Sequence, residues 1–97
     1  MPTYVTLVKF TDQGIKVVKD TQDAQQEAIQ NAEKAGVKLK GLYFLMGEYD
    51  MIVITESPSD EVALAGSIVA SADGNIKTAT MRAFTNDEFF GIISNLP

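Results

Sequence analysis

The sequence contains no cysteine and no histidine. Disulfide bonds, thiolate chemistry and zinc sites with cysteine or histidine ligands are therefore excluded. A serine nucleophile would lack the histidine base of the usual triad, and no G-x-G-x-x-G or Walker pattern is present to hold phosphates. Carboxylates alone remain as metal ligands, but they fit helix caps and a solvated helix face better, so we expect no metal and no cofactor. These carboxylates are Asp12, Asp20, Asp23 and Glu27.

Positive charge is also scarce, because 8 lysine and arginine residues face 13 aspartate and glutamate residues, for a formal net charge of −5. A general nucleic-acid binder needs a clustered basic surface, so we expect no nucleic-acid partner. No apolar run approaches the roughly 18–20 residues of a membrane helix, and we expect no membrane association. The N-terminus has no basic region followed by an apolar core, so no signal peptide is visible and we expect a cytoplasmic protein.

The 97 residues fit one domain over residues 1–97, and a hydrophobic content of 45% is ordinary for a globular protein. Runs of β-branched and aromatic residues predict four strands, and apolar residues at helical spacing predict two main helices. A capping box at Thr85 and Glu88 predicts a short terminal helix. Gly36 and Gly74 end the main helices, and Pro58 suits a first helical turn. The expected strands cover residues 3–10, 37–46, 49–56 and 76–84, and the main helices cover 22–35 and 58–73.

The order of these elements is β-α-β-β-α-β followed by a short helix. With right-handed crossovers this order closes as an α+β, ferredoxin-like fold with an antiparallel four-stranded sheet and both main helices on one face. The segment between Thr11 and residue 22 also carries capping and helical signals. The sequence leaves open whether residues 12–35 form one helix or a short helix followed by a long one.

One face of such a sheet is open, and alternation along each strand assigns residues to the two faces. We expect the isoleucines of the third strand, Ile52 and Ile54, to face the helices. Val53 and the rest of its set would then form an apolar open face that pairs two chains into a homodimer or a higher homo-oligomer. The outward set comprises Tyr4, Val8, Phe10, Met51, Val53 and Phe84.

Four stretches of the sequence resemble the GYD domain family, named for a Gly-x-Tyr-Asp turn. They are Met1–Val5, Phe10–Lys16, Gly47–Asp50 and Arg82–Thr85. The resemblance spans essentially the whole chain and implies a ferredoxin-like, dimeric α+β barrel domain. The family is bacterial and has no settled biochemical function, so the resemblance adds little about activity.

Tyr49 and Asp50 follow Gly47 at the predicted hairpin and form the first candidate site. In a functional interpretation Tyr49 donates a hydrogen bond at a cleft and Asp50 acts as a base or acceptor. In a structural interpretation, which we favour, Asp50 stabilises the turn by accepting hydrogen bonds from nearby backbone N–H groups.

Arg82, the only arginine, is the second candidate. The parity of its strand predicts that it points away from the helices, on one face with Tyr4, Thr6 and Thr80. A lone guanidinium there would bind a carboxylate or phosphate ligand, or pair with an acidic residue, and we expect the partner to come from another subunit or a bound anion. Aromatic residues such as Tyr4 would line a ligand cavity or, more commonly, belong to the core or an interface.

Three functions fit these features. The leading hypothesis is a small dimeric domain that binds a small molecule in an open-face or inter-subunit cavity. The first alternative is a cofactor-free oxygenase or isomerase that uses Tyr49, Asp50 and Arg82. The second is an assembly module with no ligand. The sequence does not decide whether the protein is an enzyme.

Overall fold

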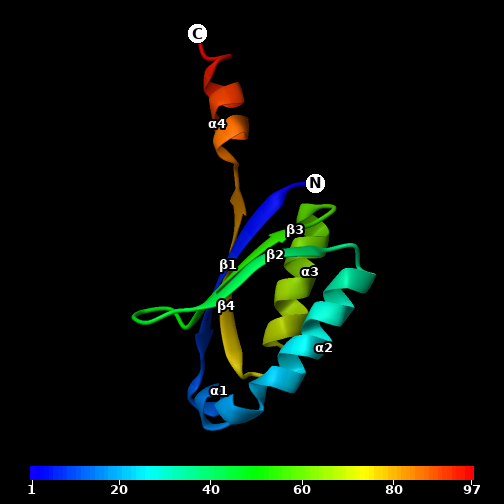
Figure 1. Ribbon diagram of the computed structural model, residues 1–97, viewed down its shortest axis with the longest axis vertical. Coiled ribbons are helices and arrows are strands. Elements are labelled where there is room, and N and C mark those ends of the chain that lie inside the picture. The colour runs from blue at the N-terminus through cyan, green and yellow to red at the C-terminus, as the bar shows by residue number, and fades with distance from the viewer.

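Four antiparallel strands form one sheet in the computed structural model, which describes residues 1–97 (Figure 1). The strand order is β2-β3-β1-β4, so the central β1 pairs with both β3 and β4. This is the ferredoxin-like βαββαβ arrangement, and the predicted fold class is confirmed. The strands are β1 (Thr3–Phe10), β2 (Lys38–Phe44), β3 (Met51–Glu56) and β4 (Ile76–Ala83).

The two main helices, α2 and α3, lie on the same side of the sheet (Figure 1). A short helix and a 3₁₀ turn precede α2, so the segment after β1 is not one continuous helix. None of the helices is long and apolar enough to span a membrane. The helices are α1 (Asp12–Lys16), α2 (Thr21–Lys34), α3 (Asp60–Ser71) and α4 (Asn86–Ile93), with the 3₁₀ helix η1 at Val18–Asp20.

The helix ends follow their local sequence closely. Gly36 and Gly74 adopt φ angles of 86° and 82°, which side chains disfavour. The capping box of α4 is present in full, with Thr85 and Glu88 satisfying each other's backbone N–H groups. The expectation for Pro58 was wrong, because Ser59 caps α3 and Pro58 therefore precedes the helix.

The short helix α1 is fastened to the turn before β4. Thr11 donates its backbone N–H to the Asn75 carbonyl at 3.0 Å and its hydroxyl to the Gly74 carbonyl at 2.7 Å. Gln13 reaches the side-chain oxygen of Asn75 at 2.8 Å. Gly14 is buried in this contact, and a Cβ atom there would lie 1.9 Å from the Asn75 carbonyl oxygen. Only glycine therefore lets the two segments approach so closely.

The assignment of sheet faces from alternation was wrong. Tyr4 and Val8 are buried under the helices, and the Thr80 hydroxyl lies 2.6 Å from that of Ser67 on α3. Cross-strand partners share a face, and Val5 pairs with both Ile54 and Met81. The isoleucines of β3 therefore lie on the open face. The prediction failed because α3 meets the sheet with hydroxyl groups, which pair with the threonine set of β4 rather than with its apolar set.

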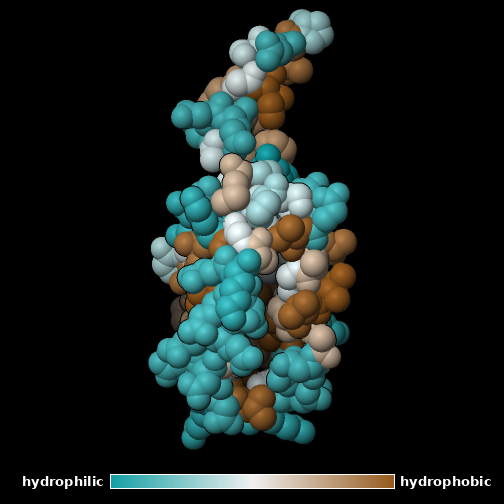
Figure 2. All heavy atoms as spheres, turned by 90° about the vertical axis from the view of Figure 1, so that its right-hand side faces the viewer, coloured by the Kyte–Doolittle hydropathy of each residue, from teal (hydrophilic) through white to brown (hydrophobic).

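Helix α3 carries large apolar side chains away from the sheet. Its sheet-facing residues include Ser67 and Ser71, whereas Leu64, Ile68 and Val69 are between 62% and 71% exposed. Figure 2 shows hydrophobic atoms along the right-hand side of the body, where α3 lies, and hydrophilic atoms on the side of α2. An exposed apolar surface of this kind on a helix indicates a site of interaction with another molecule.

The last helix, α4, projects beyond the end of the sheet and does not pack on the body (Figure 1). The radius of gyration is 14.8 Å and the long axis measures 52 Å. A folded chain of this length has a typical radius of gyration of about 12.5 Å. The excess reflects this projecting helix, whose side chains are all exposed.

Candidate functional site

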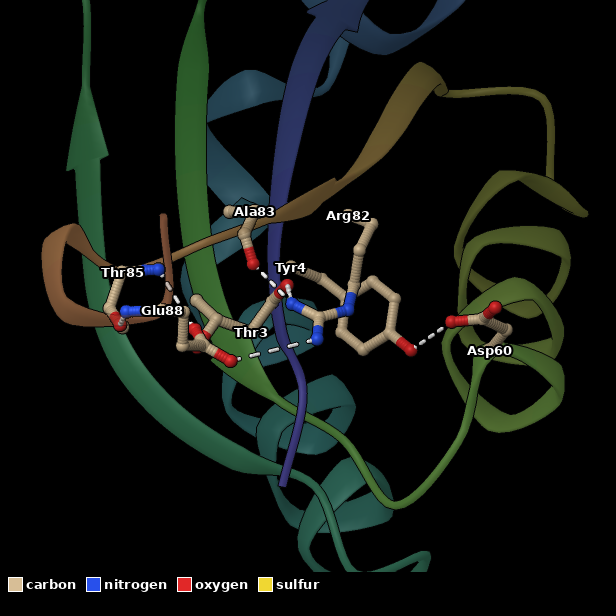
Figure 3. A network of polar contacts seen from close by, with 7 residues as sticks. All are labelled: Thr3, Tyr4, Asp60, Arg82, Ala83, Thr85 and Glu88. Carbon is tan, nitrogen blue, oxygen red and sulfur yellow. Dashed lines mark hydrogen bonds and ion pairs between the residues drawn. The ribbon is translucent and has the colours of Figure 1, made fainter. Parts of the chain in front are cut away.

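A polar cluster forms where the N-terminal end of β1 meets the start of α3 (Figure 3). The Tyr4 hydroxyl donates a hydrogen bond to the carboxylate of Asp60, in the first turn of α3. This bond, together with desolvation, raises the pKa of Tyr4, because the neutral phenol is the form that donates to a carboxylate. The contact ties the sheet to α3 with a charge-assisted hydrogen bond.

Arg82 lies beside Tyr4 on the same face of the sheet, where the register pairs the two residues. Its guanidinium carbon is 5.9 Å from the centre of the Tyr4 ring and 4.5 Å from that of Phe84. The expected orientation away from the helix-covered face was therefore wrong. Figure 3 shows the guanidinium pointing away from α3, towards Thr3, Ala83 and Glu88 at the sheet end from which α4 departs.

The partners of Arg82 come from its own chain. The guanidinium donates to the carbonyl oxygens of Ala83 and Thr3 and lies 3.8 Å from a carboxylate oxygen of Glu88. The Thr85 backbone N–H and hydroxyl lower the pKa of Glu88, since both favour the charged carboxylate. Arg82 thus connects the sheet end to the capping box of α4, where the sequence predicted a partner from another subunit or a bound anion.

A hydroxyl network continues from this cluster between β1, β4 and α3. The Thr6 hydroxyl lies 3.0 Å from that of Thr80, which lies 2.6 Å from that of Ser67. One turn further along α3, the Ser71 hydroxyl is 3.4 Å from that of Thr78. Four predicted site residues therefore share one face of the sheet, and their polar groups already have partners. These four are Tyr4, Thr6, Thr80 and Arg82.

The other two predicted site residues, Tyr49 and Asp50, lie at the opposite end of β1. The Asp50 backbone N–H donates to the Val8 carbonyl at 2.9 Å, five strand positions from the pair formed by Thr3 and Ala83. Strand geometry places the two ends roughly 17 Å apart. The Asp50 carboxylate accepts a hydrogen bond from the Phe10 backbone N–H at 2.8 Å. This is the structural interpretation of Asp50, and the polar groups of the postulated enzyme do not converge.

Two hollows of the surface lie along α3 and the edge strand β4. One has a volume of 470 Å³ and a neighbouring one, towards α1, has a volume of 590 Å³. Both are lined by Ser71 and Thr78, so the two hollows adjoin. No group of three acidic side chains is placed to hold a metal ion. We refer to the first hollow as the α3–β4 groove, lined by Leu64, Ser67, Ile68, Ser71, Ala72, Thr78 and Thr80.

Sequence reasoning missed Asp60 and the two serines of α3 as partners of the sheet. A signal was present, since Ser67 and Ser71 are four residues apart and Thr78 and Thr80 are two apart. Such spacings put each pair on one face of its element. These spacings indicate a polar contact between α3 and β4, in which the serine side of the helix faces the threonine side of the strand.

Comparisons with known proteins agree with this architecture. A family model described as the GYD domain matches residues 4–93. The glutamine synthetase and cystathionine beta-lyase binding protein of Thermus thermophilus is 26% identical over 84 residues, which cover 86% of this chain and 88% of that relative.

Two solved structures share the fold. The chain named FFRP-DM1 is 25% identical, has a TM-score of 0.51, and is matched over 100% of its length by 87% of this chain. MtbAldR has a TM-score of 0.56 at 14% identity, which shows a common fold alone. The match covers 88% of this chain and 53% of MtbAldR, so this chain spans about half of that protein.

Proposed function

This chain belongs to the GYD domain family, and we propose that it is a homo-oligomeric binding module that docks on an enzyme of amino-acid metabolism. Binding rather than catalysis is favoured because the side chains that could act as acids or bases are engaged in structural hydrogen bonds. Tyr4 is bonded to Asp60, and Asp50 is bonded to the backbone of Phe10.

The observation that carries the proposal is a surplus of exposed surface that includes many large apolar side chains, among them Leu64, Ile68 and Phe89. The chain exposes 6941 Å², whereas a folded monomer of the same mass typically exposes about 5,400 Å². The surplus of roughly 1,500 Å² exceeds the about 800 Å² per partner that a standard protein–protein interface buries. A surplus of this size, with large apolar side chains exposed across it, indicates interaction surfaces.

The open sheet face is the proposed homodimer interface. It carries the apolar residues that the register aligns across three strands, and isologous packing of two such faces would cover them. A sheet-to-sheet contact of this kind corresponds to the α+β barrel that the family resemblance implies. The residues concerned are Val5, Leu7, Ile52, Ile54, Ala79 and Met81.

The class of partner follows from the relative in Thermus thermophilus, whose name states that it binds glutamine synthetase and cystathionine beta-lyase. The similarity extends over most of both chains, which supports a shared binding role. The two enzymes named for the relative both act on amino acids, and they define the probes for an experiment.

The test uses the purified full chain, immobilised through a biotin at its N-terminus. Biolayer interferometry then measures the binding of glutamine synthetase and cystathionine beta-lyase from the organism that encodes this chain. Serum albumin is the negative control. We expect at least one enzyme to bind with a dissociation constant below about 10 μM. Failure of both enzymes to bind would contradict the proposed partner class.

A second candidate function is the binding of a small anion at Arg82. The supporting observation is that the side chain is one third exposed and lies against two aromatic rings, with Glu88 as an exchangeable partner. Thermal shift with citrate and inorganic phosphate compares the unmodified chain with Arg82→Met. A thermal shift that the anion causes in the unmodified chain but not in Arg82→Met would make Arg82 a site residue, whereas an equal shift in both, or none in either, would contradict anion binding at Arg82.

A further inference from the structure

We propose that α4 is an exchange arm whose apolar face docks in the α3–β4 groove of a second copy of this chain. This contact is separate from the open sheet face. It extends the proposed self-association, because it predicts a second interface in which one chain contributes α4 and the other contributes the α3–β4 groove.

The arm is a well-formed helix with one apolar side. Thr85 and Glu88 close its capping box, and the ion pair between Arg82 and Glu88 at 3.8 Å holds its start against the sheet. The apolar residues follow helical spacing, while Asp87, Gly91 and Ser94 form the other side. A short, fully exposed helix is marginal in water unless its apolar side finds a partner. The apolar side consists of Phe89, Ile92, Ile93 and Leu96, with Phe90 beside it.

The groove is suited to an apolar occupant. Leu64 and Ile68 form its outer wall and are each 62% exposed. Its hydroxyl groups already bond one another or the helix backbone: Ser67 with Thr80 at 2.6 Å, and Ser71 with the Ser67 carbonyl at 2.9 Å. Covering satisfied hydroxyls with side chains such as phenylalanine leaves no polar group unpaired. A strongly polar ligand would find few free partners there.

The dimensions of arm and groove agree. Helix α4 spans eight residues, and the wall of the groove runs from Leu64 to Ala72 on α3. At a helical rise of about 1.5 Å per residue, both are roughly 12 Å long. An occupant at this position would also shield the free edge of β4, which otherwise exposes unpaired backbone groups.

The arm cannot fill the groove of its own chain in this conformation. It leaves the C-terminal end of β4 and points away from the body (Figure 1). The groove instead runs back along β4 towards Thr78. A second copy supplies arm and groove in equal number, and reciprocal exchange closes with two-fold symmetry. The groove lining contains no charged residue, so nothing in it selects a charged partner protein over another copy.

The absence of cysteine allows a direct cross-linking test. Two single variants of the full chain, Phe90→Cys and Ile68→Cys, are mixed and oxidised, and mixed disulfides are quantified by mass spectrometry. The matched control pairs Phe90→Cys with Met46→Cys, whose side chain is fully exposed on the β2–β3 connection. We expect the first pair to yield at least about tenfold more mixed disulfide than the control, as a specific contact requires. Equal yields would overturn the proposal.

A charge substitution separates the arm from the sheet interface. Ile92→Lys places a charge on the apolar side of α4, and Ser94→Lys places the same charge on its polar side. By light scattering we expect Ile92→Lys to lower the assembly mass by about one half, to the sheet-paired dimer, and Ser94→Lys to leave it unchanged. An unchanged mass for Ile92→Lys would overturn the arm while leaving the sheet dimer intact. Loss of enzyme binding without a change in mass would assign α4 to a different protein partner and would also overturn it.

Discussion

The carboxylate of Asp50 accepts a hydrogen bond from the Phe10 backbone N–H at 2.8 Å, while the Asp50 N–H donates to the Val8 carbonyl at 2.9 Å. One residue therefore fastens the β2–β3 connection to the end of β1, forty residues away in the sequence. Its side chain takes the place of a strand backbone at a point where regular pairing with β3 has ended.

We expect Asp50→Ala to lower the free energy of unfolding by about 1–3 kcal/mol, because the Phe10 N–H loses its partner. Asp50→Asn keeps an acceptor oxygen at the same position and should retain most of the stability. Urea unfolding followed by circular dichroism measures both variants. Equal stability of the unmodified chain and Asp50→Ala would show that water replaces the carboxylate without loss.

The contact of Gly14 with Asn75 makes a second prediction. A Cβ atom at Gly14 would meet the Asn75 carbonyl oxygen at 1.9 Å, so Gly14→Ala must push α1 away from the turn before β4. We expect a loss of about 1–3 kcal/mol or more in thermal or urea unfolding.

Gly66 is the matched control for this substitution. It lies in α3, and a Cβ atom there would meet nothing within 4 Å. Gly66→Ala should therefore stabilise the chain by about 0.5–1 kcal/mol through helix propensity. If both alanine variants were stabilising, the close approach at Gly14 would not exist in solution.

The hydrogen bond from Tyr4 to Asp60 predicts a loss of stability in alkali. The pKa of Tyr4 is raised in the folded chain, so the folded state holds this proton more tightly than the unfolded state. The stabilisation is complete below the ordinary tyrosine pKa of about 10, and it is lost as the pH rises through the raised value. In urea unfolding between about pH 8 and 11, the midpoint should fall more steeply for the unmodified chain than for Tyr4→Phe. Parallel curves would contradict this.

Because Ile54 lies on the open sheet face, a substitution at this residue tests the sheet dimer. We expect Ile54→Asp to halve the assembly mass, leaving chains paired through α4 alone, because it places an unpaired charge on the open face. Ala24→Asp, on the exposed side of α2, is the control and should leave the mass unchanged. Light scattering at micromolar concentration is the measurement. A monomeric unmodified chain would contradict self-association through either surface.

Much of the fold was predictable because its signals are local. The glycines at positions 36 and 74, the cap at Thr11 and the capping box of α4 each act within a few residues of chain. Their spacing established the order of elements, and the rule of right-handed crossovers then leaves the ferredoxin-like arrangement. The structural role of Asp50 was also favoured in advance, since carboxylates at turns commonly accept from nearby backbone groups.

The faces of the sheet were not predictable in the same way, because alternation separates two sets of residues without stating which set meets the helices. That choice was made by contacts between distant segments, above all by Ser67 with Thr80 and Tyr4 with Asp60. These hydrogen bonds favour a polar seam under α3 and leave its leucine and isoleucine outside. Thus the sequence by itself determined the elements, their ends and their order, through local propensity and backbone constraint. Tertiary structure alone decided which side chains remain exposed for binding, because that depends on hydrogen-bond pairing across segments that the chain brings together only on folding.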